Sequence, residues 1–164
     1  MHSYDPAEWH DLFVAVAGAA AALAGLLFVA LSINLKQILA APVLALRAAA
    51  ALATLILAVI VSILILVPGQ HRTVLGSELL VCAAPTWLFI TRAQLRLGRS
   101  GQQTPVQFGT DLALAQLAMV PIVLAGASLV AGAGGGLYWL VLALVFVFIS
   151  TTTRAWVLLV EVNR

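Results

Sequence analysis

The stretch GAAAALAGLLFVALSINL at residues 18–35 contains no charged side chain, and it lies inside a longer apolar run from Leu12 to Leu35. A helix needs about 20 apolar residues to cross the roughly 30 Å hydrocarbon core of a bilayer. Backbone groups in lipid have no water to bond, so a run of this length without alternation predicts a helix rather than a strand. We therefore predict that the chain crosses a membrane here.

Further apolar stretches follow this one, and the predicted fold is an all-α bundle of five transmembrane helices in a single transmembrane domain. The predicted spans are residues 12–35, 43–67, 79–92, 112–131 and 137–160, within a domain that covers residues 1–164. Of the 164 residues, 63% are hydrophobic and 9% are charged. Soluble domains carry about 25% charged residues, so this composition leaves no room for a separate soluble domain. The formal charge of +2 and the lack of a basic stripe argue against a nucleic-acid partner.

The third span is the shortest, because Glu78 and Arg92 leave only 13 uncharged residues between them. That length corresponds to about 20 Å of helix, which crosses only with snorkelling ends or local thinning of the bilayer. Charge counting favours crossing, since it places seven cations on one side and only Arg72 on the other. The seven are Lys36, Arg47, Arg92, Arg96, Arg99, Arg154 and Arg164. Cytoplasmic loops attract Lys and Arg, so we predict an outside N-terminus, a cytoplasmic C-terminus and a cytoplasmic loop at residues 93–110.

The first span carries a face of small residues. Gly18, Gly25 and Ser32 are spaced seven apart, and Ala22 lies near them on the same side of the predicted helix. In lipid, small side chains let helix backbones approach, and van der Waals contact then holds them together. We expect this face to be the most tightly packed surface of the protein, against its own chain or a second copy. A homo-oligomer is the expected assembly.

Polar residues inside the spans gather near their predicted cytoplasmic ends. The members of this inner-leaflet polar cluster are Asn34, Arg47, Asp111, Gln116, Thr151, Thr152 and Arg154. An ion pair of Asp111 with Arg47 or Arg154 is expected, and Asn34 is expected to bridge helices with Gln116. The cluster either joins the helices to one another or forms a vestibule or a site for an ion or anionic headgroup.

Two further groups of polar residues lie outside the apolar runs. Arg92, Arg96 and Arg99 are candidates for contact with anionic lipid headgroups, with mere orientation of the protein as the alternative. On the opposite side, His10 and His71 are candidates for metal binding or pH sensing, with solvated ends of the chain as the alternative. Their ligand spacing supports no metal site, and no cofactor is predicted. The chain contains no H-E-x-x-H, G-x-S-x-G or C-x-x-C signature, so no enzymatic activity is predicted.

Four stretches together carry a resemblance to known proteins. They are GLLFVALSINL at residues 25–35, PGQ at 68–70, GSELL at 76–80 and AWVLLVEV at 155–162. On these stretches the chain resembles a group of small bacterial multi-pass integral membrane proteins, mainly actinobacterial, to which no activity is assigned. The resemblance implies a location in the bacterial inner (plasma) membrane and implies no site residues.

The leading functional hypothesis is a non-enzymatic, channel-like scaffold for permeation of a small solute, with the inner-leaflet polar cluster as its vestibule. One alternative is a structural or regulatory membrane subunit that binds other membrane proteins, and another is a protein that binds or senses anionic lipid. A channel predicts that Asn34, Gln116 and Thr151 or Thr152 face a common wet axis. A subunit predicts that these side chains are sequestered between helices, while Gly18 and Gly25 are exposed on the monomer.

Overall fold

The computed structural model describes residues 5–99 and 104–162, and these residues form helices joined by short turns. The elements in chain order are η2 (Pro6–Trp9), α1 (His10–Ile33), α2 (Leu35–Ala40), α3 (Pro42–Ile65), α4 (Arg72–Arg99), α5 (Pro105–Ala131) and α6 (Tyr138–Val162). Five of the described helices, all except η2 and α2, are long and apolar enough to cross a membrane. The predicted all-α class is thus confirmed, as is the prediction of five helices long and apolar enough to span a membrane. A multi-pass, membrane-embedded protein fits these helices.

Helix α4 is much longer than the predicted third span, with 28 residues from Arg72 to Arg99. The prediction stopped the helix at Glu78 and Arg92 because charged side chains are costly in hydrocarbon. Both lie in the helix near its ends, where charged groups on long side chains reach water or headgroups. The predicted loop at residues 93–110 is therefore wrong in extent, since α4 continues to Arg99 and α5 begins at Pro105.

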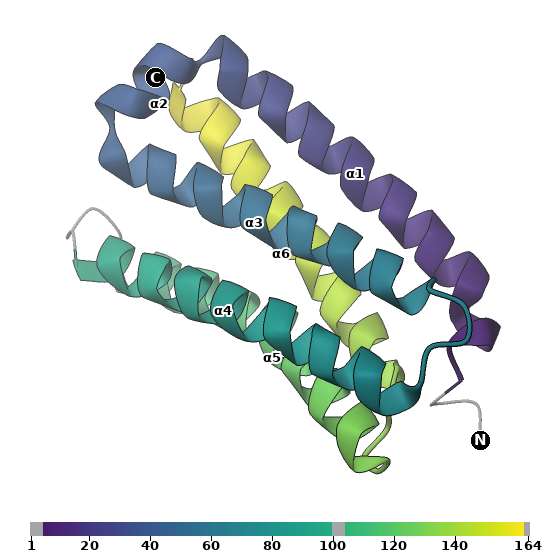
Figure 1. Ribbon diagram of the computed structural model, residues 1–164. Coiled ribbons are helices and arrows are strands. Elements are labelled where there is room, and N and C mark those ends of the chain that lie inside the picture. Colours follow the sequence, from purple (N-terminus) through teal and green to yellow (C-terminus); the bar gives the residue numbers. More distant parts are fainter. Residues whose placement is uncertain (1–4, 100–103, 163–164) are drawn as a thin grey trace.

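The link between the first two spans is also helical. Asn34 leaves the helical conformation at φ −105° and ψ 18°, which separates α1 from the six-residue α2. Pro42 then occupies the first turn of α3, where a missing backbone N–H costs nothing. Helix α2 is too short to cross a membrane, so it serves as a connector at one end of the bundle (Figure 1).

The helices pack as two groups, α1 with α3 and α4 with α5, which are joined by α6 and by direct contact of α3 with α4 (Figure 1). Helices α4 and α5 form the closest pair, α6 packs against α5 and α3, and α1 packs mainly against α3. Only 22% of the most apolar segment of α1 is buried inside the chain, compared with 56% in α3. Helix α1 begins and α6 ends at opposite ends of the bundle, as an odd number of crossings requires.

Two glycines bring α4 and α5 together. A Cβ atom at Gly76 would lie 2.7 Å from the carbonyl oxygen of Gly126, and one at Gly126 would lie 3.0 Å from that of Gly76. Both distances are too short for a side chain, so the two backbones touch only because both residues are glycine. This crossing is the close contact that the sequence led us to expect on α1.

The small-residue face of α1 points away from the chain. Gly18, Ala22, Gly25 and Ser32 are all exposed, and no atom lies within 4 Å of a Cβ built at either glycine. The expectation that this face is the most tightly packed surface is wrong within one chain. The core instead consists of leucine, isoleucine, valine and alanine side chains from all five long helices, together with Phe13 and Met119. Contact of the exposed face with a second copy stays a prediction.

The glycine-rich turn between α5 and α6 is an ordered cap. Gly132 ends α5 in the left-handed conformation at φ +70°, and the guanidinium of Arg72 lies against it. Ser128 Oγ donates to the carbonyl oxygen of Ala133 at 2.6 Å and accepts from the backbone N–H of Gly136 at 2.8 Å. The cation therefore sits at the negative end of the α5 dipole.

Candidate functional site

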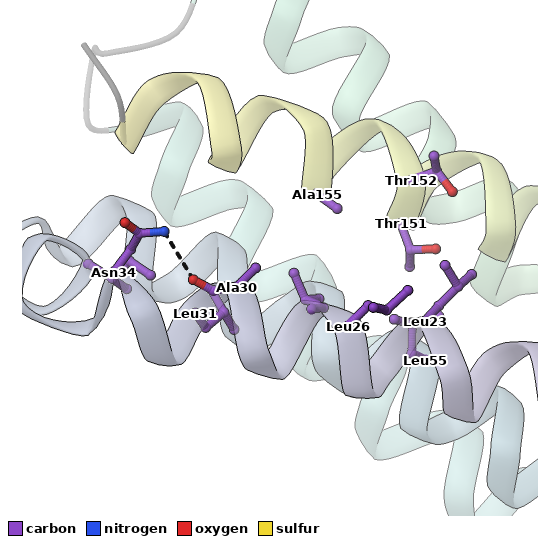
Figure 2. Close-up of a pocket in the computed structure, with 11 residues that line it drawn as sticks. Leu23, Leu26, Ala30, Leu31, Asn34, Leu55, Thr151, Thr152 and Ala155 are labelled. Carbon is purple, nitrogen blue, oxygen red and sulfur yellow. Dashed lines mark hydrogen bonds between the residues drawn. The ribbon is translucent and has the colours of Figure 1, made fainter.

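A groove between α1 and α6 is the candidate site. It encloses about 140 Å³ and is lined by Leu23, Leu26, Leu27, Ala30, Leu31, Asn34, Ile38, Leu55, Thr151, Thr152 and Ala155. Figure 2 shows the α1 side chains facing Thr151 and Ala155 of α6 across it. We call it the α1–α6 groove.

The groove exists because α1 packs along α3 and has little contact with α6. Leu27 of α1 packs in a small core with Ala48, Ala51 and Leu55 of α3, and this core forms the floor of the groove. At the other end of the bundle, the rings of Trp9 and Tyr138 meet edge to face with centroids 4.8 Å apart. The two helices are thus tied together at one end and spaced apart at the other, where α6 presents only short side chains.

The predicted inner-leaflet polar cluster divides into three separate groups, and the first lies in the groove. Asn34 Nδ2 donates to the carbonyl oxygen of Ala30 at 3.1 Å, and Thr151 Oγ1 donates to that of Val147 at 2.7 Å. Both bonds return to the side chain's own helix, one turn earlier. The Thr152 hydroxyl makes no hydrogen bond within the described part of the chain.

The second group joins α5 to α4. Gln116 Oε1 accepts a hydrogen bond from Trp87 Nε1 at 2.7 Å, and Gln116 Nε2 donates to Thr91 Oγ1 at 3.1 Å. The predicted bridge between Gln116 and Asn34 is wrong, because Gln116 bonds to α4 whereas the Asn34 amide bonds back to α1. Gln116 is a connector inside the α4–α5 pair, so it does not share a wet axis with Asn34.

The third group lies where α3, α5 and α6 come together near the α2 end. Arg154 is only 9% exposed, and its Nη2 donates to the carbonyl oxygen of Asp111 at 3.4 Å. Asp111 attracts the positive charge of Arg154, and Arg47 repels it, so all three residues are electrostatic neighbours. The sequence correctly brought Arg154 to Asp111, although the hydrogen bond found here goes to the backbone oxygen.

Sequence reasoning missed a buried amide on α4. Gln94 is 3% exposed, and its Oε1 has no hydrogen-bond partner among the described residues. It lies between Thr91 and Gly98, and these contact Gln116 and Phe108 of α5 respectively. The prediction placed residue 94 in a loop, so no burial was expected there. Tracing the helical periodicity of α4 beyond Arg92 would have placed Gln94 on its α5 side.

The three arginines predicted to meet lipid headgroups lie on α4 rather than in a loop. Arg92, Arg96 and Arg99 are exposed, and the last two belong to the final turn of the helix. Arg92 and Arg96 border a shallow cavity of about 390 Å³ with Leu46 of α3 and Phe89. Cations in a last helical turn also interact favourably with the helix dipole, so headgroup contact is not needed to explain them.

The histidines at the opposite end have local partners. His10 Nδ1 lies 3.4 Å from Asp11 Oδ1, and His71 Nδ1 lies 2.8 Å from Thr73 Oγ1. Among the described residues, no three His, Cys, Asp or Glu side chains gather closely enough to hold a metal ion. Glu78 accepts a hydrogen bond from Gln70 Nε2. The described residues of this end therefore form no group that could hold the metal considered above.

Comparisons with protein families, with curated proteins and with solved structures find no match. The resemblance to small actinobacterial membrane proteins stays a prediction.

Proposed function

We propose that this protein is a structural subunit of the bacterial plasma membrane that acts by binding a transmembrane helix with the outer face of α1, and that its partner is a second copy of the same chain. The observation that carries the proposal is the open space beside Gly18 and Gly25, since nothing lies within 4 Å of a Cβ at either. The bacterial membrane itself rests on the sequence resemblance.

The physical reason is the nature of attraction between helices in lipid. Lipid tails are as apolar as leucine, so helices associate where small residues allow close backbone contact. Gly18, Ala22 and Gly25 form such a surface along the most exposed long helix, and the backbone contact is unused within the chain. The Gly76–Gly126 crossing shows what the same residue type does when a partner helix is present.

The placement of the polar residues favours this role over permeation through one chain. Gln116 is enclosed between α4 and α5, while Asn34 and Thr151 lie in a groove beside α1. The buried Thr54 and Ser62 hydroxyls of α3 donate to the carbonyl oxygens of Ala50 and Ala58 in their own helix. These side chains bond within their own helix or between two neighbouring helices and do not meet in one group, so a channel lined by them would require an axis between copies.

The orientation proposed from the sequence is retained. The described cations Lys36, Arg47, Arg92, Arg96, Arg99 and Arg154 belong to helix ends at the α2 side of the bundle, and Arg72 belongs to the opposite side. Arg164, which the prediction counts with them, lies outside the described residues. This distribution supports a cytoplasmic α2 end and an outside start of α1.

The test is the mass of the purified full chain in lipid nanodiscs and mild detergent. We expect a dimer or small oligomer that is converted to a monomer by Gly18→Leu combined with Gly25→Leu. Gly109→Leu is the matched control, because Gly109 of α5 is also helical and also has open space at its Cβ position. A wild-type chain that stays monomeric at high protein density, or an oligomer that survives both leucines, would remove the proposal. Solute flux into liposomes by the monomeric double variant would favour a channel instead.

A further inference from the structure

We propose that the α1–α6 groove binds one acyl chain of an anionic phospholipid, whose phosphate lies at the α2 end beside Asn34 and Lys36. This inference is independent of the proposed self-association. Gly25 and Leu27 are two residues apart and therefore point about 200° apart around α1, so the outer face and the groove are opposite sides of one helix.

The length and lining of the groove match a single leaflet. From Leu23 to Asn34 its α1 wall rises by eleven residue steps, or about 16 Å of helix, which is close to half of the roughly 30 Å hydrocarbon core. Except for Asn34, Thr151 and Thr152, its lining consists of leucine, isoleucine and alanine. Apolar cavities exclude water, so hydrocarbon is the expected content of a groove that opens within a membrane.

The volume favours an acyl chain over a helix from another protein. A helix is about 10 Å wide with its side chains, so a 16 Å segment would occupy on the order of 1,000 Å³. The empty space of the groove, its open side included, is about 670 Å³, which is less than a helix needs and enough for one slender chain. Alanine and threonine on α6 keep the groove open, because a larger side chain at Ala155 would fill it.

The charge at the α2 end favours an anionic headgroup. At this end Lys36 follows Asn34 by two residues and is exposed, while Arg47 and Arg154 lie beside Asp111 on α3 and α6, outside the lining of the groove. These three cations and Asp111 give a net charge of +2 (three minus one) among the described side chains named here. Asn34 uses one amide hydrogen for Ala30, so its second hydrogen is available to a phosphate or ester oxygen. An anionic surface lipid gains from each such cation.

The test measures retained lipid on the full chain by native mass spectrometry, after reconstitution in vesicles of phosphatidylglycerol and phosphatidylcholine in equal amounts. Wild-type protein should retain about one phospholipid, with phosphatidylglycerol preferred at least five-fold. Ala155→Phe should lower the occupancy about ten-fold, whereas Ala113→Phe, at an exposed position of α5, should not change it. Lys36→Gln should reduce the headgroup preference several-fold, and the control Arg96→Gln should leave it unchanged.

Several outcomes would overturn the proposal. They are undiminished lipid on Ala155→Phe, equal retention of the two lipids by the wild type, and a larger effect of Arg96→Gln than of Lys36→Gln. If Ala155→Phe does not fold, a fluorophore on Thr152→Cys in a Cys82→Ala background reports the same site. Phosphatidylglycerol with brominated chains should quench it more strongly than brominated phosphatidylcholine. Equal quenching by the two, or a Thr152→Cys disulfide between two copies, contradicts a lipid in the groove.

Discussion

Two pairs of glycines in this molecule have the same chemistry and opposite surroundings. Gly76 and Gly126 bring the backbones of α4 and α5 into contact, while Gly18 and Gly25 of α1 have open space at the same atomic position. Each glycine lies within a long apolar helix. The difference shows that a small residue marks where a helix can be approached, whereas the rest of the fold decides whether its own chain supplies the partner.

The first way to break this comparison is Gly126→Leu, for which we expect the largest effect. The leucine would collide with the Gly76 backbone and Leu80, so α4 and α5 would have to separate. Overpacking of this kind costs about 3 kcal/mol, and here it strikes the closest helix pair. The measurement is the free energy of unfolding in mixed micelles. Gly109→Leu on the same helix is the control, and equal unfolding of both variants would disprove the close crossing.

The next largest effect is expected at the end of α5, from Gly132→Ala. Gly132 has φ +70°, where a Cβ costs about 1–2 kcal/mol, and the added atom would also displace the Arg72 guanidinium. The thermal midpoint should fall accordingly. In an Arg72→Ala background the same substitution should cost less, because only the backbone strain then remains. An identical cost in both backgrounds would show that Arg72 does not contribute.

A smaller effect tests the polar connection within the same helix pair, about 15 Å along α5 from Gly126. Gln116→Leu removes the hydrogen bonds to Trp87 and Thr91. Interhelical hydrogen bonds in membranes average about 0.6 kcal/mol each, so a loss near 1 kcal/mol is expected. A double-mutant cycle with Trp87→Phe isolates one of the two bonds. A coupling energy of zero would mean that Gln116 and Trp87 do not interact in the membrane.

The smallest effect on monomer stability is expected from Gly18→Leu. The side chain would enter open space, so the unfolding free energy in monomer-forming detergent should stay within about 0.5 kcal/mol or rise. Helix propensity favours leucine over glycine, which gives the direction of any gain. A loss of 2 kcal/mol or more in unfolding free energy would mean that α1 packs its small face inside the chain. The contrast between the two pairs of glycines would then be wrong.

Most of the fold could be predicted from sequence, because runs of apolar residues long enough to cross lipid leave only a helix as a solution. The ends of α4 could not, since Glu78 and Arg92 were treated as boundaries although long side chains tolerate positions near a membrane surface. The short α2 was missed because six residues carry too little periodicity to reveal a helix.

The candidate site was harder to predict than the fold. The sequence placed Asn34, Gln116 and Arg154 at one depth in the membrane, because the position of a residue along a spanning helix sets its depth. It could not say which helices are neighbours, and the α4–α5 pairing moved Gln116 away from Asn34. The groove itself depends on the packing of α1 along α3. No single residue of α1 indicates this pairing in the sequence.

The contact of Arg72 with Gly132 has a consequence for biogenesis. In the proposed orientation Arg72 is the described arginine that must cross the membrane to the outer side. This transfer opposes the positive-inside rule, which keeps the other described arginines on the cytoplasmic side. Its attachment to the finished end of α5 makes that transfer harder to reverse. The contact between Arg72 and the end of α5 would then stabilise the topology. It can form only after α5 has emerged from the ribosome.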